Sequence, residues 1–137
     1  MRELKFRCYL KDSYIERQKD YWWYEEEKAN RIRKVHSIHL NVRKVIVSSI
    51  LGGNQSVGFD DIGLMQFTGL YDKNNVPIYE GDIVKSPYLN DDSLYSITYW
   101  KCGFMLQGLK SGDYYDFIGD LLGTLEVVGN IYDEENE

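Results

Sequence analysis

The sequence predicts a mainly β fold, in which the C-terminal half forms a small and strongly bent β-barrel. Three features predict it: short apolar runs that alternate with polar residues, 12 glycines against 2 prolines, and 12 tyrosines within an aromatic content of 15%. Large rings pack well on the half-buried surface of a sheet, and glycines bend or end short strands. The length of 137 residues suits one domain with a core of its own.

The N-terminal half begins with a strand, because apolar and polar residues alternate in "LKFRCYL" from Leu4 to Leu10. The charged and aromatic stretch that follows has no clean period, so we expect a loop or hairpin and then a short helix near Tyr24 to Lys34. From Val35 to Ile50 β-branched residues dominate and change faces. This pattern predicts either two short strands or one strand with a bulge near Arg43 and Lys44.

Residues 51–63, "LGGNQSVGFDDIG", are rich in glycine and lack an apolar pattern, which predicts a long exposed connection between the halves. The strands of the expected barrel follow it. Pro77 cannot donate to a β-ladder, so its segment is expected at a sheet edge or a strand entry. "LYSITYW" and "GFMLQG" predict a hairpin with Gly103 in its turn or in a bulge.

Near the C-terminus, the spacing of Phe117, Leu121 and Leu122 predicts a single helical turn. "TLEVVGNIY" predicts a last strand with a bulge at Gly129. The acidic tail "DEENE" is expected to fray.

The charges of the chain are unevenly distributed. Residues 1–44 contain 12 Lys and Arg against 7 Asp and Glu, a net charge of +5, whereas residues 45–137 carry 4 against 15, a net charge of -11. A phosphate-binding surface is therefore expected only in the N-terminal part. No apolar run has the length of about 18 residues that spans a bilayer, and the first residues are charged where a signal peptide is apolar. We expect a cytoplasmic protein without a membrane partner.

Three blocks carry a resemblance to a known family: "RELKFRCY" at the start, "LMQFTGLYDKNNVPIYEGDIVK" in the middle and "GTLEVVGNIYDEE" at the end. In this order and spacing they resemble the YopX family of phage and prophage proteins, with Tyr9 where the family tends to have Trp. The resemblance implies an N-terminal α+β region over residues 1–58 and a C-terminal SH3-like barrel over residues 59–137, which together can form one compact unit. It implies a bacterial host and no established activity.

Nine residues of these blocks are expected to have structural roles: Gln66, Thr68, Gly69, Tyr79, Glu80, Gly81, Asp82, Gly129 and Asn130. The motif "YEGD" among them has two interpretations. As a strand corner, Gly81 supplies a positive φ and Asp82 accepts backbone N–H groups. As a site, Glu80 and Asp82 share one face of a strand and act as metal ligands or as an acid/base pair.

The histidines and cysteines predict neither a metal site nor a catalytic residue. His36 and His39 are three positions apart, which on a regular strand places them on opposite faces. Cys8 and Cys102 lie in apolar, strand-like stretches and are expected to be small core residues. "GGNQSVG" lacks the Lys and the Ser or Thr of a phosphate loop, so no cofactor is expected.

"DYWWYEEE" brings four aromatic residues together: Tyr21, Trp22, Trp23 and Tyr24. With Arg31 and Arg33 nearby, these rings could stack on unpaired bases while the guanidinium groups follow the phosphates. Alternatively they pack against the rest of the chain, against a second copy or against a protein partner. The glutamates that follow directly favour the second interpretation, because they repel phosphate.

Three functions follow from these observations. The first is a phage-encoded, non-enzymatic interaction module that binds a host or phage protein or a second copy of itself. The second is a nucleic-acid-binding accessory protein that uses the basic, aromatic N-terminal region. The third is a metal-dependent hydrolase centred on Glu80 and Asp82, for which the spacing provides no third ligand and no nucleophile.

Overall fold

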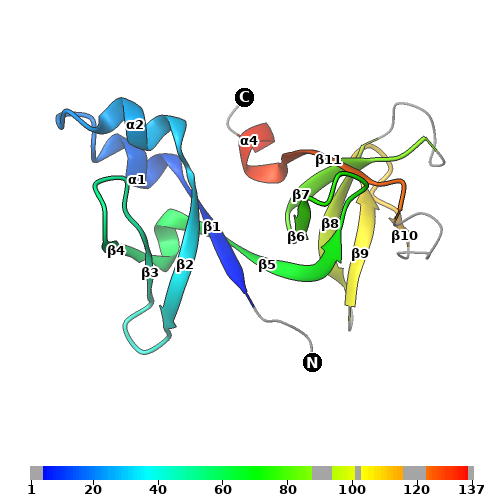
Figure 1. Cartoon of the computed structure of the whole chain (residues 1–137), viewed down its shortest axis with the longest axis horizontal. Helices are drawn as coiled ribbons and strands as arrows, with labels where there is room; N and C mark the ends of the chain where they lie inside the picture. Colours follow the sequence, from blue (N-terminus) through cyan, green and yellow to red (C-terminus); the bar gives the residue numbers. More distant parts are fainter. Residues whose placement is uncertain (1–4, 88–93, 101–102, 116–122, 136–137) are drawn as a thin grey trace. The chain divides into compact units, whose positions relative to one another are not determined.

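The computed structural model describes residues 5–87, 94–100, 103–115 and 123–135, and these are mainly β. The strands form two antiparallel sheets, with the orders β4-β3-β2-β1-β5-β6 and β10-β9-β8-β7-β11. The chain divides into two compact units, Lys5–Met65 and the residues from Gln66 onward (Figure 1). The mainly β prediction is confirmed. Among the described strands neither sheet closes on itself, so the closed barrel that we predicted is not confirmed.

The first unit is an antiparallel sheet with two short helices on one face (Figure 1). Its elements are β1 (Phe6–Leu10), α1 (Asp12–Glu16), α2 (Tyr24–Ala29), β2 (Ile32–His39), β3 (Lys44–Ser48), β4 (Asn54–Gly58), the 3-10 turn η1 (Phe59–Asp61) and the first part of β5 (Ile62–Tyr71). The inward side chains of the strands, such as Cys8 and Val45, form a core with Ile15 of α1. Tyr24 of α2 packs against the same core.

Several expectations for this unit were wrong. The stretch after β1 contains the helix α1 where we expected a loop or hairpin. The expected helix up to Lys34 is shorter, because α2 ends at Ala29 and strand β2 begins at Ile32. Of the alternatives left open for residues 35–50, two strands form, joined by a turn in which Arg43 has a φ of 54°. The expected exposed connection contains β4, which pairs with β3 over its whole length.

The second unit holds the continuation of β5 and the elements that follow it. They are β6 (Pro77–Tyr79), β7 (Asp82–Lys85), β8 (Tyr95–Trp100), β9 (Gly103–Gly108), β10 (Tyr114–Tyr115), β11 (Glu126–Asn130) and α4 (Ile131–Glu135). Buried side chains from β6 to β9 and Leu125 form a separate core: Ile78, Val84, Tyr95, Ile97, Leu106 and Leu125. Pairing along β7, β8, β9 and β10 is antiparallel throughout.

Most expectations for this unit are confirmed. β8 and β9 form the hairpin with Gly103 opposite Trp100, Pro77 begins the edge strand β6, and β11 has a register shift between Val127 and Gly129. The fraying of the whole tail was wrong, because α4 extends to Glu135. The Asn130 side chain caps it by accepting the N–H groups of residues 132 and 133. The helical turn predicted at residues 117–122 and the core role of Cys102 lie outside the described residues.

The helices of the described part are all too short or too polar to cross a membrane.

Candidate functional site

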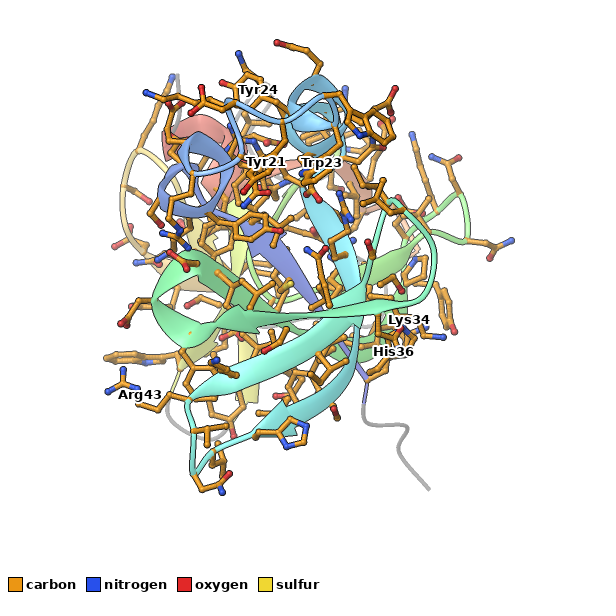
Figure 2. All side chains as sticks on the ribbon, turned by 90° about the vertical axis from the view of Figure 1, so that its left-hand side faces the viewer. Tyr21, Trp23, Tyr24, Lys34, His36 and Arg43 are labelled. Carbon is orange, nitrogen blue, oxygen red and sulfur yellow. The ribbon has the colours of Figure 1, made fainter. Side chains whose placement is uncertain are left out.

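The aromatic residues between α1 and α2 form an exposed ledge on the first unit. We use the name aromatic ledge for Tyr21, Trp22 and Trp23. The ring of Tyr21 is stacked on Trp23 with a centroid distance of 4.5 Å and an interplanar angle of 7°, and Trp22 meets Trp23 edge-on at 5.6 Å. Trp22 is 79% exposed and Tyr21 is 52% exposed. Figure 2 shows Tyr21, Trp23 and Tyr24 together on the helix side of the sheet.

Local hydrogen bonds hold the aromatic ledge in place. The indole N–H of Trp23 donates to the Gln18 side chain at 3.0 Å, and the backbone N–H of Tyr21 donates to the carbonyl of Gln18 at 2.9 Å. Glu27 N–H donates to the carbonyl of Trp23, which ties the ledge to the first turn of α2. Trp22 is the most exposed of the three rings, and its side chain is available to a partner at little cost in ordering the backbone.

Tyr24 does not belong to the exposed surface. Its ring packs against the core of the first unit, and the Lys28 ammonium lies 5.7 Å from its centroid. The sequence therefore predicted four grouped rings, and the structure separates them into three ledge residues and one residue of the core boundary.

Arg33, expected to contact phosphate, is instead part of a buried ion pair. Its guanidinium lies 3.0 Å from the Glu27 carboxylate, and the two side chains are 5% and 2% exposed. Arg33 also donates to the carbonyls of Asn30 and Ser48, so that α2, β2 and β3 are joined through one side chain. Burial raises the pKa of the Glu27 carboxyl, although the Arg33 charge acts in the opposite direction.

Arg31 is engaged in the same way, though nearer the surface. It forms an ion pair with Asp12 at 2.6 Å and lies over the ring of Tyr9, 5.6 Å from the centroid. Its side chain is 15% exposed. Arg17, a third arginine of this region, pairs with Asp61. The guanidinium groups that were expected beside the aromatic rings are thus bound to carboxylates of the chain itself.

Free positive charge lies on the opposite face of the sheet. Lys34, His36, His39 and Lys44 form what we call the basic face, on the outer side of β2 and β3. All four are exposed, and none of the described residues of β2, β3 and β4 is Asp or Glu. Figure 2 shows Lys34 and His36 close together on β2.

The expectation that His36 and His39 lie on opposite faces was wrong. His36 Nε2 is 2.9 Å from the hydroxyl of Ser48, and His39 is paired with Lys44, and both partners point away from the core. The reason is a register shift between Val35 and Ser37, which inserts one residue and reverses the alternation. The two histidines therefore share the basic face.

The "YEGD" motif forms a tight corner between β6 and β7. Gly81 has a φ of 91°, the positive value expected from the sequence, and the buried Asp82 carboxylate accepts the N–H of Tyr79 at 2.8 Å. Three backbone hydrogen bonds connect the corner to neighbouring elements. The N–H of Glu80 donates to the Gln66 carbonyl and the N–H of Gly81 donates to the Ile97 carbonyl. The Gly81 carbonyl accepts the N–H of Ile131. Burial raises the pKa of the Glu80 carboxyl.

The other motif residues also lie in hydrogen-bonded backbone positions. Thr68 donates from its hydroxyl to the Ile78 carbonyl at 2.8 Å, and Gly69 has a φ of 87°. Gly129 follows the bulge of β11, and Asn130 caps α4. These contacts support strand pairing and turns. Within the described part of the chain, no three His, Cys, Asp or Glu side chains come together as a metal site would require.

Cys8 is inert core. Its thiol is fully buried, and burial raises its pKa to about 12, although the Arg33 charge lowers it in part.

A cavity of about 250 Å³ beside the turn after β9 is lined by residues such as Tyr95, Leu109 and Asp113. In this lining the Ser111 hydroxyl accepts the backbone N–H of Asp113, and no histidine lies among the described lining residues to act as its general base.

Two features were missed by sequence reasoning. The Asp72 carboxylate in the turn between β5 and β6 accepts the N–H of Val127 in β11, a contact between distant parts of the sequence. Trp100 and Tyr114 form a second stacked pair on the second unit, with a centroid distance of 4.5 Å and ring planes 13° apart. The signal for that pair is weak, because its members are 14 positions apart and meet only through the register of β8, β9 and β10.

Two comparisons with known proteins match nearly the whole chain. A family model described as YopX protein matches residues 5–136. The crystal structure of protein EF1440 from Enterococcus faecalis is similar, with a TM-score of 0.57 and 22% sequence identity over 98% of this chain and 97% of that chain. At this identity the likeness shows the fold alone. A search of curated proteins gave no match.

Proposed function

This chain belongs to the YopX family, and from that premise we propose that it is a phage- or prophage-encoded, non-enzymatic interaction module of the bacterial cytoplasm that binds a host or phage protein through the aromatic ledge. The observation that carries the proposal is Trp22, whose side chain is 79% exposed beside the stacked pair of Tyr21 and Trp23. An indole left in water on a fixed support is the kind of anchor that dominates protein interfaces.

The charges around the ledge favour a protein over a nucleic acid. Glu25 and Glu26 are exposed in the first turn of α2, directly after the aromatic residues. Arg31 and Arg33, which would neutralise a nucleic-acid backbone, are bound to Asp12 and Glu27. The carboxylates of Glu25 and Glu26 would repel the phosphates of a nucleic acid bound at the ledge. A protein pocket with an apolar centre and a polar or basic rim would not be repelled by them.

The second unit supports the same assignment through its architecture. We propose that it is an open form of the SH3-like barrel that the family resemblance implies. This is supported by the antiparallel meander of β7, β8, β9 and β10 and by the return of β11 beside β7. At its corner the Asp82 carboxylate accepts the backbone N–H of Tyr79, which supports a structural role for this motif residue in a scaffold.

The experiment for this proposal compares two exposed aromatic residues. The full chain and its Trp22→Ala variant are used to capture proteins from a bacterial lysate in which the phage genes are expressed. A single partner enriched by the wild type and lost with Trp22→Ala is expected, with affinity reduced about 30-fold or more. Tyr99→Ala is the matched control, because Tyr99 is 51% exposed but lies on β8. Loss of the partner with both variants, or with neither, argues against the ledge.

A second candidate function rests on the basic face. Lys34 and Lys44 are exposed without an ion pair among the described residues, and two histidines lie between them. On this face the described strands β2, β3 and β4 carry no carboxylate that would repel a nucleic-acid backbone. Binding to labelled single-stranded RNA should then weaken with salt, and the double change Lys34→Gln and Lys44→Gln should lower the salt slope by roughly 1.4. Lys110→Gln, on an exposed turn of the second unit, serves as the control.

A further inference from the structure

Among the described strands the two sheets have four edges, and β4 is the one of these four that lacks protection against further pairing. Natural edge strands are commonly short, bulged, charged or interrupted by proline. β6 has three residues and begins at Pro77, β10 has two residues, and β11 is bulged and carries Glu126. β4, with the sequence NQSVG, has five residues, no charge and no proline, and its register with β3 is regular throughout.

The outer side of β4 presents a row of backbone groups that take no part in the ladder with β3. Ser49 N–H donates to the Gly53 carbonyl and Phe59 N–H to the Arg43 carbonyl, which fixes the hydrogen-bonded pairs of the ladder. Because such pairs alternate, Gln55 and Val57 bond to β3. The N–H and C=O groups of Asn54, Ser56 and Gly58 therefore point away from β3. Of these, the Gly58 carbonyl also accepts the first N–H of the 3-10 turn η1, as an N-cap carbonyl does. The Asn54 and Ser56 residues are exposed.

We propose that two copies of this chain pair antiparallel through β4, about a twofold axis at Ser56. The outward residues at positions 54, 56 and 58 are symmetric about Ser56, so the edge is complementary to itself. Ser56 lies opposite Ser56 of the second copy, and Asn54 lies opposite Gly58. Each outward N–H then meets an outward carbonyl, and the first-unit sheets of two chains become one continuous sheet.

Side-chain chemistry favours a second copy as the occupant. In this register the facing residues are Asn, Ser and Gly, so no like charges oppose each other across the axis. Lys44 is the nearest cation of the sheet, one strand inside the edge and beside Gly58. The twofold register therefore places it near Asn54 of the second copy and away from the second Lys44. The Val57 side chain, which is 2% exposed, belongs to the core face of the first-unit sheet. The core faces of the two copies would therefore continue across the paired edge.

The test uses charge at the symmetry axis. Analytical ultracentrifugation of the full chain should show a concentration-dependent dimer. Ser56→Asp and Ser56→Lys should each weaken it by about tenfold or more, because like charges then face each other. A mixture of the two variants should form a heterodimer at least as stable as the wild-type dimer. This rescue requires the two Ser56 residues to lie together, and an interface elsewhere on the chain would not show it.

Proline variants distinguish an effect on pairing between copies from an effect on the stability of the monomer. Ser56→Pro removes only an outward N–H and should abolish the dimer with little change in the unfolding midpoint, whereas Gln55→Pro breaks the ladder to β3 and should destabilise the monomer. A wild type that stays monomeric at all concentrations overturns the proposal, and so does a dimer that tolerates Ser56→Asp. The inference goes beyond the ledge proposal: Trp22→Ala should leave the dimer intact, and Ser56→Asp should leave partner capture intact.

Discussion

The carboxylate of Asp72 accepts a hydrogen bond from the backbone N–H of Val127 at 3.0 Å, across 55 positions of the sequence. Its other oxygen accepts the N–H groups of Asn74 and Val76, at 2.8 Å and 2.9 Å. One buried side chain therefore closes the turn between β5 and β6 and fastens it to β11. Asp72 lies within the longest block of the family resemblance, and this contact gives a structural reason for a carboxylate at that position.

Replacing Asp72 by Asn should destabilise the protein by about 1–3 kcal/mol, because an amide N–H₂ group would face backbone donors in a buried position. The measurement is urea-induced unfolding followed by circular dichroism. Asp60→Asn is the control, since the Asp60 side chain is 92% exposed and its removal should change stability by less than about 0.5 kcal/mol. Equal stability of the two variants would contradict the structural role of Asp72.

The same carboxylate should make stability depend on acid pH. Burial by itself would raise the pKa of Asp72, but the N–H donors of Val127, Val76 and Asn74 hold it below its usual range. A depressed folded pKa means that the stabilisation is complete above the unfolded value of about 3.9 and is lost as the pH falls through the folded value. Asp72→Asn should therefore lose less stability than the wild type between about pH 5 and pH 2. A parallel pH profile for both proteins would contradict this assignment.

A side chain at Gly69 should lower the stability of the fold because of the backbone conformation alone. Its φ is 87°, and a Cβ at this position would meet no atom within 4 Å. Gly69→Ala should cost about 1–2 kcal/mol because L residues are strained in this region. Gly103 also has open space but no positive φ, so Gly103→Ala should be neutral or slightly stabilising. Thermal unfolding of the two variants provides the comparison, and equal midpoints would refute the backbone argument.

The buried ion pair should respond unequally to the loss of each partner. Glu27→Gln leaves a guanidinium that cannot lose its proton, at a cost of about 3 kcal/mol. Arg33→Met leaves a carboxyl whose pKa burial already raises, so that it can take up a proton. It also leaves the Asn30 and Ser48 carbonyls without their donor, so it should cost more than Glu27→Gln. Chemical unfolding of both variants checks the order, with Glu26→Gln on the exposed side of α2 as the control. The opposite order would contradict the predicted asymmetry.

Regular alternation explains how much of the fold could be predicted. β1, the β8–β9 hairpin and the bulge before Gly129 were found because one face of each strand is buried and turn residues separate them. β4 could not be found in this way, because only Val57 of its five residues is buried and its pairing depends on β3. An edge strand made mostly of polar residues cannot be distinguished by its composition from a polar loop.

The candidate site was predicted only in part. The aromatic cluster was evident from its composition, but the arginines near it were assigned to the surface because charge alone does not reveal burial. Arg33 occupies an inward position of β2, and its partner Glu27 lies on a helix whose end the sequence did not fix. Similarly, the shared face of His36 and His39 depends on a bulge with no glycine to mark it.

The most direct test of the central claim is the binding isotherm of the captured partner with the wild type and with Trp22→Ala, measured by titration calorimetry on the full chain. The account predicts a loss of about 30-fold or more in affinity for Trp22→Ala, with Tyr99→Ala unchanged. Identical isotherms for wild type and Trp22→Ala would show that the aromatic ledge is not the binding surface and would contradict the proposed function.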